Sequence, residues 1–246
     1  MKTLIIGKGE VGQTLYNVLS RVHPVRIRDL KELELEDVEV LHVCFPYFKG
    51  FEKEVKRYQK KYQPKYTIIH STVPVGTSRQ CQAFHSPIRG MHPNLAEGIK
   101  TFVKYLAPQN SFLKKYFELA GIKIQMFKKP ETTELLKILD TTYYGWNIVF
   151  CKEVKRICDE QDLNFEEVYT LPNLSYNEGY EKLGLPLVRR PVLRPVLGKI
   201  GGHCITSNCS LLKDKLTKII LDFDRQYPKK IRKQSQKYFK LNHISN

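Results

Sequence analysis

The sequence predicts an α/β fold, with an N-terminal Rossmann-type parallel sheet followed by a smaller, mainly helical domain. In the first half of the 246-residue chain, short β-branched runs alternate with stretches of helical periodicity. This alternation is typical of a parallel sheet covered by helices. It stops near Lys128, after which a long apolar-periodic stretch begins. We therefore expect residues 1–127 to form the Rossmann-type domain and residues 128–246 to form the helical domain, with a basic tail at its end.

The elements of the first domain follow from local patterns. Runs rich in β-branched and aromatic residues predict strands at Leu4–Ile6, Val25–Arg28, Val38–Phe45 and Tyr66–His70. Helical spacing predicts a helix over Val11–Val22, and the charged stretch Tyr47–Tyr62 is expected to be a surface helix. Two further runs, Ile88–His92 and Ile122–Met126, are expected as edge strands.

The second domain is expected to be built around one long helix over Thr132–Gln161, whose apolar residues recur at helical spacing. Its aromatic patch indicates a homodimer contact, the alternative being burial against the protein's own first domain; the patch comprises Tyr143, Tyr144, Trp146 and Phe150. The Pro-, Gly- and Arg-rich stretch Leu171–Gly202 is expected to be an extended loop, and Leu211–Phe223 a final helix.

Composition places the chain among folded proteins, with 41% hydrophobic and 27% charged residues. No apolar run approaches the ~20 residues that a membrane span needs, so we expect a cytoplasmic protein. The net charge of +16 partly reflects a basic C-terminal tail, which we interpret as solubilising rather than as a nucleic-acid contact. The six cysteines are scattered and lack the paired spacing of zinc ligands, so no metal site is expected.

A glycine motif follows the first predicted strand. Gly7, Gly9 and Gly12 form G-x-G-x-x-G, with Glu10 and Val11 between the last two glycines. In the strand–turn–helix context this motif indicates a dinucleotide site, whose pyrophosphate meets the N-terminus of the helix. Asp29, at the end of the second strand, is placed to bind the adenosine ribose and favours NAD over NADP. Arg26 and Arg28 favour NADP instead, but we weigh Asp29 more heavily.

Three further segments carry a family resemblance. They are STVPVGT at 71–77, ELLK at 134–137 and GGHCI at 201–205. Together with the glycine motif they resemble the UDP-glucose/GDP-mannose dehydrogenase family, over Met1 to about Leu212. The resemblance implies oxidation of a sugar alcohol to a carboxylate with two NAD molecules. It also implies a central helical dimerisation domain and a C-terminal domain that holds the nucleotide.

The same resemblance implies roles for individual residues. Cys204 matches the nucleophile that attacks the aldehyde intermediate, and Lys137 matches the lysine that stabilises the oxyanion. Thr72 matches the threonine beside the nicotinamide, with Ser71 in the same cofactor loop, and Pro46 matches a proline near the cofactor. A lysine ammonium suits a developing alkoxide, and neighbouring positive charge suits a thiolate.

The sequence also departs from the family pattern. Asn94 and Asn208 stand where the family has glutamate and aspartate, and Thr141 stands where it has asparagine. An amide cannot act as a general base, so thioester hydrolysis is the step most affected. Only 34 residues follow Leu212 in the 246-residue sequence, so we expect a shortened form without the nucleotide-holding domain.

The resulting hypothesis is an NAD-dependent oxidoreductase that transfers a hydride to or from a small anionic substrate, a sugar phosphate or nucleotide sugar among the candidates. A basic group ahead of Cys204 is expected to bind the anion; it comprises Arg189, Arg190, Arg194, Lys199 and His203. His92 or His203 could replace the missing base. The alternatives are a catalytically decayed nucleotide-binding protein and a nucleic-acid binder that uses the basic tail.

Overall fold

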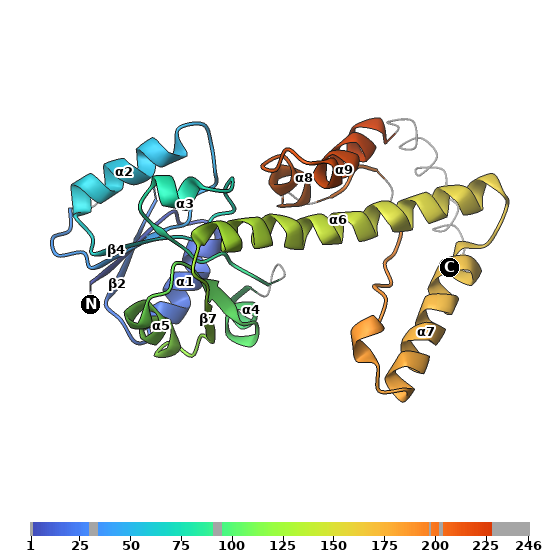
Figure 1. Ribbon diagram of the computed structural model, residues 1–246, viewed down its shortest axis with the longest axis horizontal. Helices are drawn as coiled ribbons and strands as arrows, with labels where there is room; N and C mark the ends of the chain where they lie inside the picture. Colours follow the sequence, from blue (N-terminus) through green and yellow to red (C-terminus); the bar gives the residue numbers. More distant parts are fainter. Residues whose placement is uncertain (1, 30–33, 91–94, 197, 202–203, 228–246) are drawn as a thin grey trace, which may run out of the picture. The chain divides into compact units, whose positions relative to one another are not determined.

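The computed structural model describes residues 2–29, 34–90, 95–196, 198–201 and 204–227. The chain divides into two compact units, Met1–Ile138 and Leu139–Asn246 (Figure 1). Helix α6 (Pro130–Glu160) begins in the first unit and continues into the second. The predicted domain boundary after residue 127 lies just before this helix, whereas the division between the compact units falls within it.

The first unit contains a five-stranded sheet, as the α/β prediction required. Its strands are β1 (Thr3–Ile6), β2 (Val25–Arg28), β3 (Val40–Val43), β4 (Tyr66–Ile69) and β5 (Phe84–His85). They lie in the order β2-β1-β3-β4-β5, and every neighbouring pair is parallel. The first four strands begin within two residues of the predicted runs, because β-branched residues suit a pleated, buried surface.

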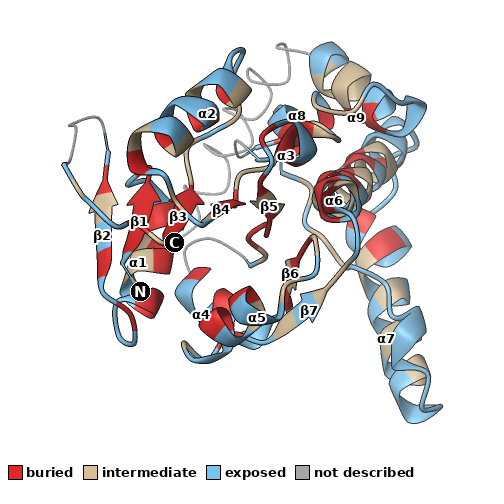
Figure 2. Cartoon of the chain, turned by 60° about the vertical axis from the view of Figure 1, so that its left-hand side comes forward, coloured by how far each residue is buried: buried red, intermediate tan, exposed pale blue. Residues whose placement is uncertain are grey.

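Helices cover both faces of this sheet. They are α1 (Glu10–Leu19), α2 (Phe51–Tyr62), α3 (Thr77–Gln80), α4 (Leu95–Thr101) and α5 (Ser111–Glu118). Alternate residues of β1 point to opposite faces: Ile5 packs with the α1, α4 and α5 side chains, while Leu4 and Ile6 pack with α2. Figure 2 shows the resulting band of buried strand residues between helices that are exposed on their outer faces.

The remaining strands pair separately. β6 (Lys104–Leu106) and β7 (Ile124–Met126) form a two-stranded parallel sheet. The predicted strand within Ile122–Met126 is therefore present. The expectation of a strand at Ile88–His92 is wrong for its described residues 88–90, since β5 ends at His85 and its edge is extended by a bridge to Ala107.

The second unit is helical over its described residues. After α6 come a π-helical turn (Glu166–Thr170), α7 (Leu171–Lys182), a 3₁₀ turn (Pro186–Val188), α8 (Cys204–Cys209) and α9 (Lys215–Gln226). The long predicted helix is present. The prediction of a loop from Leu171 onward is wrong at its start, because Pro172 occupies the first turn of α7, where its missing N–H breaks no helical bond.

Candidate active site

The predicted cofactor residues gather at one edge of the first unit's sheet. The glycine turn follows β1, Asp29 follows β2, Pro46 follows β3, and Ser71 and Thr72 follow β4. Because these strands are parallel, their carboxyl ends meet at the same edge. β2 lies on one side of β1, and β3, β4 and β5 follow on the other side, so the strand order reverses between β1 and β3. Ligands of open α/β sheets bind in the crevice at such a switch point.

The three glycines of the turn have different surroundings. Gly7 has a φ of +100°, and a Cβ there would lie 2.9 Å from the Cys44 carbonyl carbon and the Phe45 nitrogen. A Cβ on Gly12 would lie 1.8 Å from the Gly7 oxygen, so helix α1 approaches the turn too closely for any side chain. At Gly9, the N-cap of α1, a Cβ would meet nothing within 4 Å. Gly9 thus leaves an open space at a helix N-terminus, where backbone N–H groups point outward.

Glu10 and Val11 form the first turn of α1, beside that open space. Glu10 is exposed and Val11 is half-buried, with Val11 packed against the main core. Both residues were predicted to belong to the cofactor segment. Their backbone N–H groups belong to the first helical turn, in which N–H groups lack an intrahelical acceptor.

The charged residues at the end of β2 are not equivalent. Asp29 is exposed, whereas the Arg28 side chain is buried. The Arg28 guanidinium donates to the Asp29 carbonyl oxygen at 3.1 Å and to the Tyr62 hydroxyl at 3.4 Å. It also lies 5.2 Å from the centre of the Tyr58 ring. Arg28 is therefore held by its own domain, whereas Asp29 is exposed, as is Arg26 two residues before Arg28.

Two of the edge loops are fastened to each other. The Ser71 hydroxyl donates to the Phe45 carbonyl oxygen at 2.5 Å, which joins the loop after β4 to the loop that carries Pro46. The Ser71 carbonyl oxygen accepts a hydrogen bond from His85 Nε2 at 3.2 Å. Thr72 follows directly and is half-buried. The loop expected to face the nicotinamide is thus fixed at its first residue.

Lys137 lies near this loop, within the first unit. It is half-buried on α6, and its charge helps to lower the pKa of His85. Burial is the largest cause of that shift, which brings the pKa of His85 to about 3. Lys137 is consequently within electrostatic range of the histidine that holds Ser71.

A buried polar chain beneath this edge was not expected from the sequence. His70 Nδ1 donates to the Ser86 carbonyl oxygen at 2.6 Å, so its Nε2 accepts from His42 Nδ1 at 2.8 Å. His42 Nε2 in turn accepts from the Tyr116 hydroxyl at 3.1 Å. Lys104 Nζ donates to the Ser86 and Pro87 carbonyl oxygens at 2.7 and 3.1 Å. The sequence signal was present, since His42 lies inside a predicted strand and His70 ends another.

The second unit carries the predicted nucleophile. Cys204 is exposed and is the first residue of α8, and Asn208 lies one helical turn later on the same face. The Asn208 side-chain nitrogen donates to the Thr141 hydroxyl on α6 at 3.3 Å. The two positions that depart from the family pattern in this unit are therefore in direct contact, and neither side chain is an acid.

Two arginines of the predicted anion-binding group already contact other side chains of the second unit. The Arg190 guanidinium stacks over the Tyr176 ring at 3.9 Å and donates to the Asn173 side chain at 3.3 Å. Arg189 is 3.9 Å from a Glu181 carboxylate oxygen. Arg194 and Lys199 are exposed, on the segment that leads towards α8. Three predicted site residues lie outside the described part of the chain: His92, Asn94 and His203.

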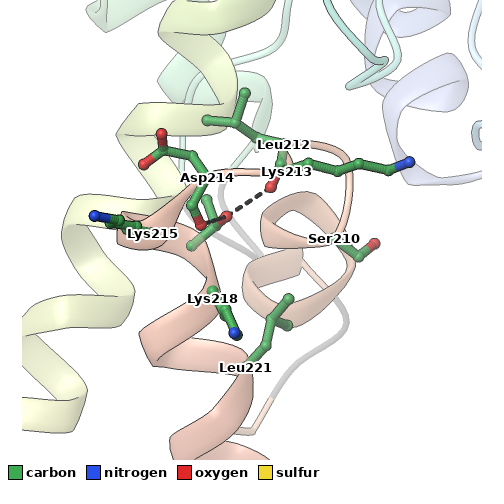
Figure 3. A pocket seen from close by; sticks show the side chains of 8 residues that line it. Ser210, Leu212, Lys213, Asp214, Lys215, Lys218 and Leu221 are labelled. Carbon is green, nitrogen blue, oxygen red and sulfur yellow. Dashed lines mark hydrogen bonds between the residues drawn. The ribbon is translucent and has the colours of Figure 1, made fainter.

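A hollow in the second unit contains none of the predicted residues. It measures about 560 Å³ and lies at the turn between α8 and α9. Figure 3 shows the side chains of Lys213, Lys215 and Lys218 leaving it in different directions, so they do not converge on one anion. Thr217 closes the turn by donating to the carbonyl oxygens of Leu212 and Asp214, at 2.6 and 3.0 Å. We interpret this hollow as a by-product of helix capping.

Two kinds of site are not found among the described residues. No group of three or more His, Cys, Asp or Glu side chains there could hold a metal ion. No helix in the described ranges is long and apolar enough to cross a membrane.

Comparison with known proteins supports the fold. Neither a family model nor a curated protein sequence matches the chain. Among solved structures, a UDP-D-ManNAc dehydrogenase from Pyrococcus horikoshii is similar, with 16% identity and a TM-score of 0.72 over 93% of this chain and 69% of that one. A UDP-N-acetyl-mannosamine dehydrogenase from Staphylococcus aureus aligns at 15% identity and a TM-score of 0.70, over 98% of this chain and 71% of that one.

A smaller enzyme aligns over nearly its whole length. The 3-hydroxyisobutyrate dehydrogenase of Mycobacterium tuberculosis has 14% identity and a TM-score of 0.65, covering 92% of this chain and 94% of that one. The predicted resemblance to nucleotide-sugar dehydrogenases is thus confirmed in the fold. A 3-hydroxyisobutyrate dehydrogenase shares the fold as well.

Proposed function

We propose that this protein is an NAD-dependent dehydrogenase that exchanges a hydride with a hydroxyl-bearing carbon of a small anionic substrate. The observation that carries the proposal is the glycine turn. Gly7 and Gly12 are required by packing, whereas Gly9 leaves unfilled space at a helix N-terminus. This is the arrangement that a pyrophosphate needs, and the residues present therefore fit a nicotinamide dinucleotide.

NAD is favoured over NADP by the charges after β2. The exposed Asp29 carboxylate suits the two ribose hydroxyls and repels an additional phosphate. Arg28, the neighbouring cation, has its guanidinium buried against Tyr58 and Tyr62. It is therefore poorly placed to receive the 2′-phosphate of NADP.

The chemistry assigned to the chain is a two-electron oxidation, in which the alcohol loses a hydride to the nicotinamide and its hydroxyl proton to water, or the reverse of that reaction. The bound nicotinamide supplies the hydride acceptor or donor. The Lys137 ammonium donates to the substrate oxygen and stabilises negative charge as it develops there. The Thr72 hydroxyl orients the reacting group at the same edge of the sheet. By the family resemblance, Cys204 is the nucleophile for a carbonyl intermediate.

A second oxidation, to the carboxylate, would require a base for hydrolysis of the thioester. Thr141 and Asn208 bond to each other where the family has an amide and an acid, and neither can accept a proton. A thioester formed on Cys204 could not be hydrolysed and would stop the enzyme, so sustained turnover requires release of the carbonyl product after the first hydride transfer, with one NADH per substrate. For the substrate we propose a sugar phosphate, a nucleotide sugar or a hydroxy acid, held through its charge by Arg194 and Lys199, which are exposed.

The first experiment is a calorimetric titration with NAD and with NADP, followed by measurement of NADH at 340 nm with sugar phosphates, UDP-sugars and hydroxy acids. We expect NAD to bind more tightly than NADP and one NADH to form per substrate consumed. Lys137→Ala should lower kcat by about 100-fold or more, as removal of an oxyanion donor does elsewhere. Lys100→Ala, on the exposed side of α4, is the control. Absence of binding of either cofactor would overturn the proposal.

A second function is favoured by the same Thr141–Asn208 contact. If the substitutions have ended catalysis, the protein holds NAD as a ligand only. That function predicts NAD binding with no turnover on any member of the panel. Nucleic-acid binding through the basic tail predicts instead an affinity that falls steeply with salt and ignores NAD.

A further inference from the structure

Glu134 is a buried carboxylate to which neither the sequence patterns nor the proposed chemistry gives a role. Its side chain is fully buried on α6. One carboxylate oxygen accepts from the Gly76 backbone N–H at 2.6 Å, and the other accepts from the Ser78 backbone N–H at 2.7 Å. A buried carboxylate is costly unless it is fully hydrogen-bonded. This pair of short, charge-assisted bonds therefore specifies a carboxylate at this position.

These bonds join two segments that are far apart in the sequence. Gly76 and Ser78 flank the start of α3, at the end of the loop that begins with Ser71 and Thr72. Glu134 lies more than 50 residues later, in the second turn of α6. The Ser71 end of the same loop is fastened by Phe45 and His85. Thr72 thus lies between two anchors, and Glu134 provides one of them.

The same helix turn carries Lys137. Residues three apart in an α-helix lie on one face, so Glu134 and Lys137 project to the same side of α6. Thr133 adds a second attachment on the preceding residue, because its hydroxyl shares a 2.8 Å hydrogen bond with His85 Nδ1. These bonds therefore fix the start of α6 relative to the loop that contains Thr72. They fix both its rotation about the helix axis and its position along that axis.

We propose that Glu134 is a positioning residue for the dehydrogenase reaction. Its carboxylate sets the Lys137 ammonium against the Thr72 loop without touching substrate or cofactor. This inference rests on the proposed function, because it assigns Lys137 to the reacting oxygen. A donor displaced by about 1 Å can cost on the order of 100-fold in rate, so a rigid link of this kind would matter for kcat.

The test is a double-mutant cycle. In Glu134→Gln, the amide NH₂ faces a backbone N–H and only one of the two bonds survives. We expect kcat to fall by about 10- to 100-fold, with the KM for NAD changed less than about 2-fold. In a Lys137→Ala background the same substitution should change kcat less than about 3-fold, because the group that Glu134 positions is already absent. The matched control is Glu153→Gln on the same helix, whose partner Arg156 lies one turn later on α6 and is 50% exposed.

An undiminished effect of Glu134→Gln in the Lys137→Ala background would overturn the proposal. A second readout needs no turnover and so separates this inference from the proposed function. The rate of Lys137 acylation is followed against pH by peptide mass spectrometry. Losing the Glu134 charge should move the midpoint of that curve to lower pH in folded Glu134→Gln, whereas Glu134→Asp, which keeps a carboxylate, should leave the midpoint close to the wild-type value. An unchanged midpoint in Glu134→Gln would overturn the proposal even if the protein proved to bind NAD without turnover.

Discussion

At the residue scale, the three glycines of the first turn separate a folding requirement from a binding requirement. Sequence alone gives all three the same letter, and the motif treats them together. The structure distinguishes them, because a Cβ at Gly12 would collide with the Gly7 oxygen whereas one at Gly9 would enter empty space. One substitution should therefore damage the fold, and the other should damage only the ligand site.

We expect Gly9→Ala to keep the melting temperature within about 2 °C while weakening NAD binding at least 10-fold, since its methyl group occupies the space assigned to the pyrophosphate. Gly12→Ala should lower the free energy of unfolding by more than about 2 kcal/mol, because helix α1 must move away from the turn. Thermal unfolding and calorimetric titration of both variants test this. Normal NAD affinity in a folded Gly9→Ala protein would contradict the proposed cofactor position.

Buried basic side chains make stability depend on pH. Burial lowers the pKa of Lys104 from 10.5 to about 7, and it lowers the pKa of His42 and of His85 from 6.5 to about 3. Each of these groups binds fewer protons when folded than when unfolded, so stability rises with pH inside its window. The histidines act between about pH 3 and 6.5, and Lys104 acts between about pH 7 and 10.5.

The substitution Lys104→Met tests the pH range in which Lys104 affects the stability of the protein. Between pH 7 and 8, below the ordinary pKa of 9.0 of the buried thiols, wild-type protein should gain up to about 1.4 kcal/mol of unfolding free energy per pH unit from this one group. The methionine variant should lose that slope, and Lys100→Met should keep it because its side chain is exposed. Urea unfolding at four pH values measures the slopes. Equal slopes in wild type and Lys104→Met would show that Lys104 is charged in the folded state throughout this range.

At the element scale, packing of α8 and α9 on α6 determines where Cys204 is held within the second unit. The contact is close at Gly145, where a Cβ would lie 2.9 Å from the Ile205 Cγ2 and 3.0 Å from the Ile220 Cδ1. Ile205 and Ile220 belong to the buried cluster between these three helices. A small residue on α6 is therefore what allows α8, with Cys204 at its start, to approach.

Substitution at Gly145 should show a size dependence. Gly145→Ala gains about 1 kcal/mol of helix propensity, which offsets a small shift of the two isoleucine side chains, so we expect little net change. Gly145→Val should lower the unfolding free energy by about 1–3 kcal/mol through overpacking. Thermal unfolding together with the alkylation rate of Cys204 measures both effects. Equal stability of the valine and alanine variants would mean that α8 does not pack here.

At the scale of the whole molecule, the sequence predicted the parallel sheet, the glycine turn and the long helix because each depends on local pattern. β-Branched runs such as Val40–Val43 report a buried strand directly. α7 was missed because Pro and Gly suggested a loop, although a proline in the first turn is compatible with a helix. The Glu134 bonds and the Asn208–Thr141 contact join residues more than 50 positions apart, so no local pattern contains them.

The exposed aromatic residues of the second unit give the last expectation, which concerns assembly. Tyr143 and Phe150 on α6 are 65% and 61% exposed, and none of the described residues of α7 is buried. Exposed apolar surface of this extent is typical of an interaction site, and a homodimer is the partner that the family resemblance implies. We expect light scattering to give twice the 28.8 kDa chain mass. Tyr143→Glu with Phe150→Glu should give the single-chain mass, while Phe102→Glu, exposed on the first unit, should not. A monomeric wild-type protein at micromolar concentration would show that these side chains serve something other than self-association.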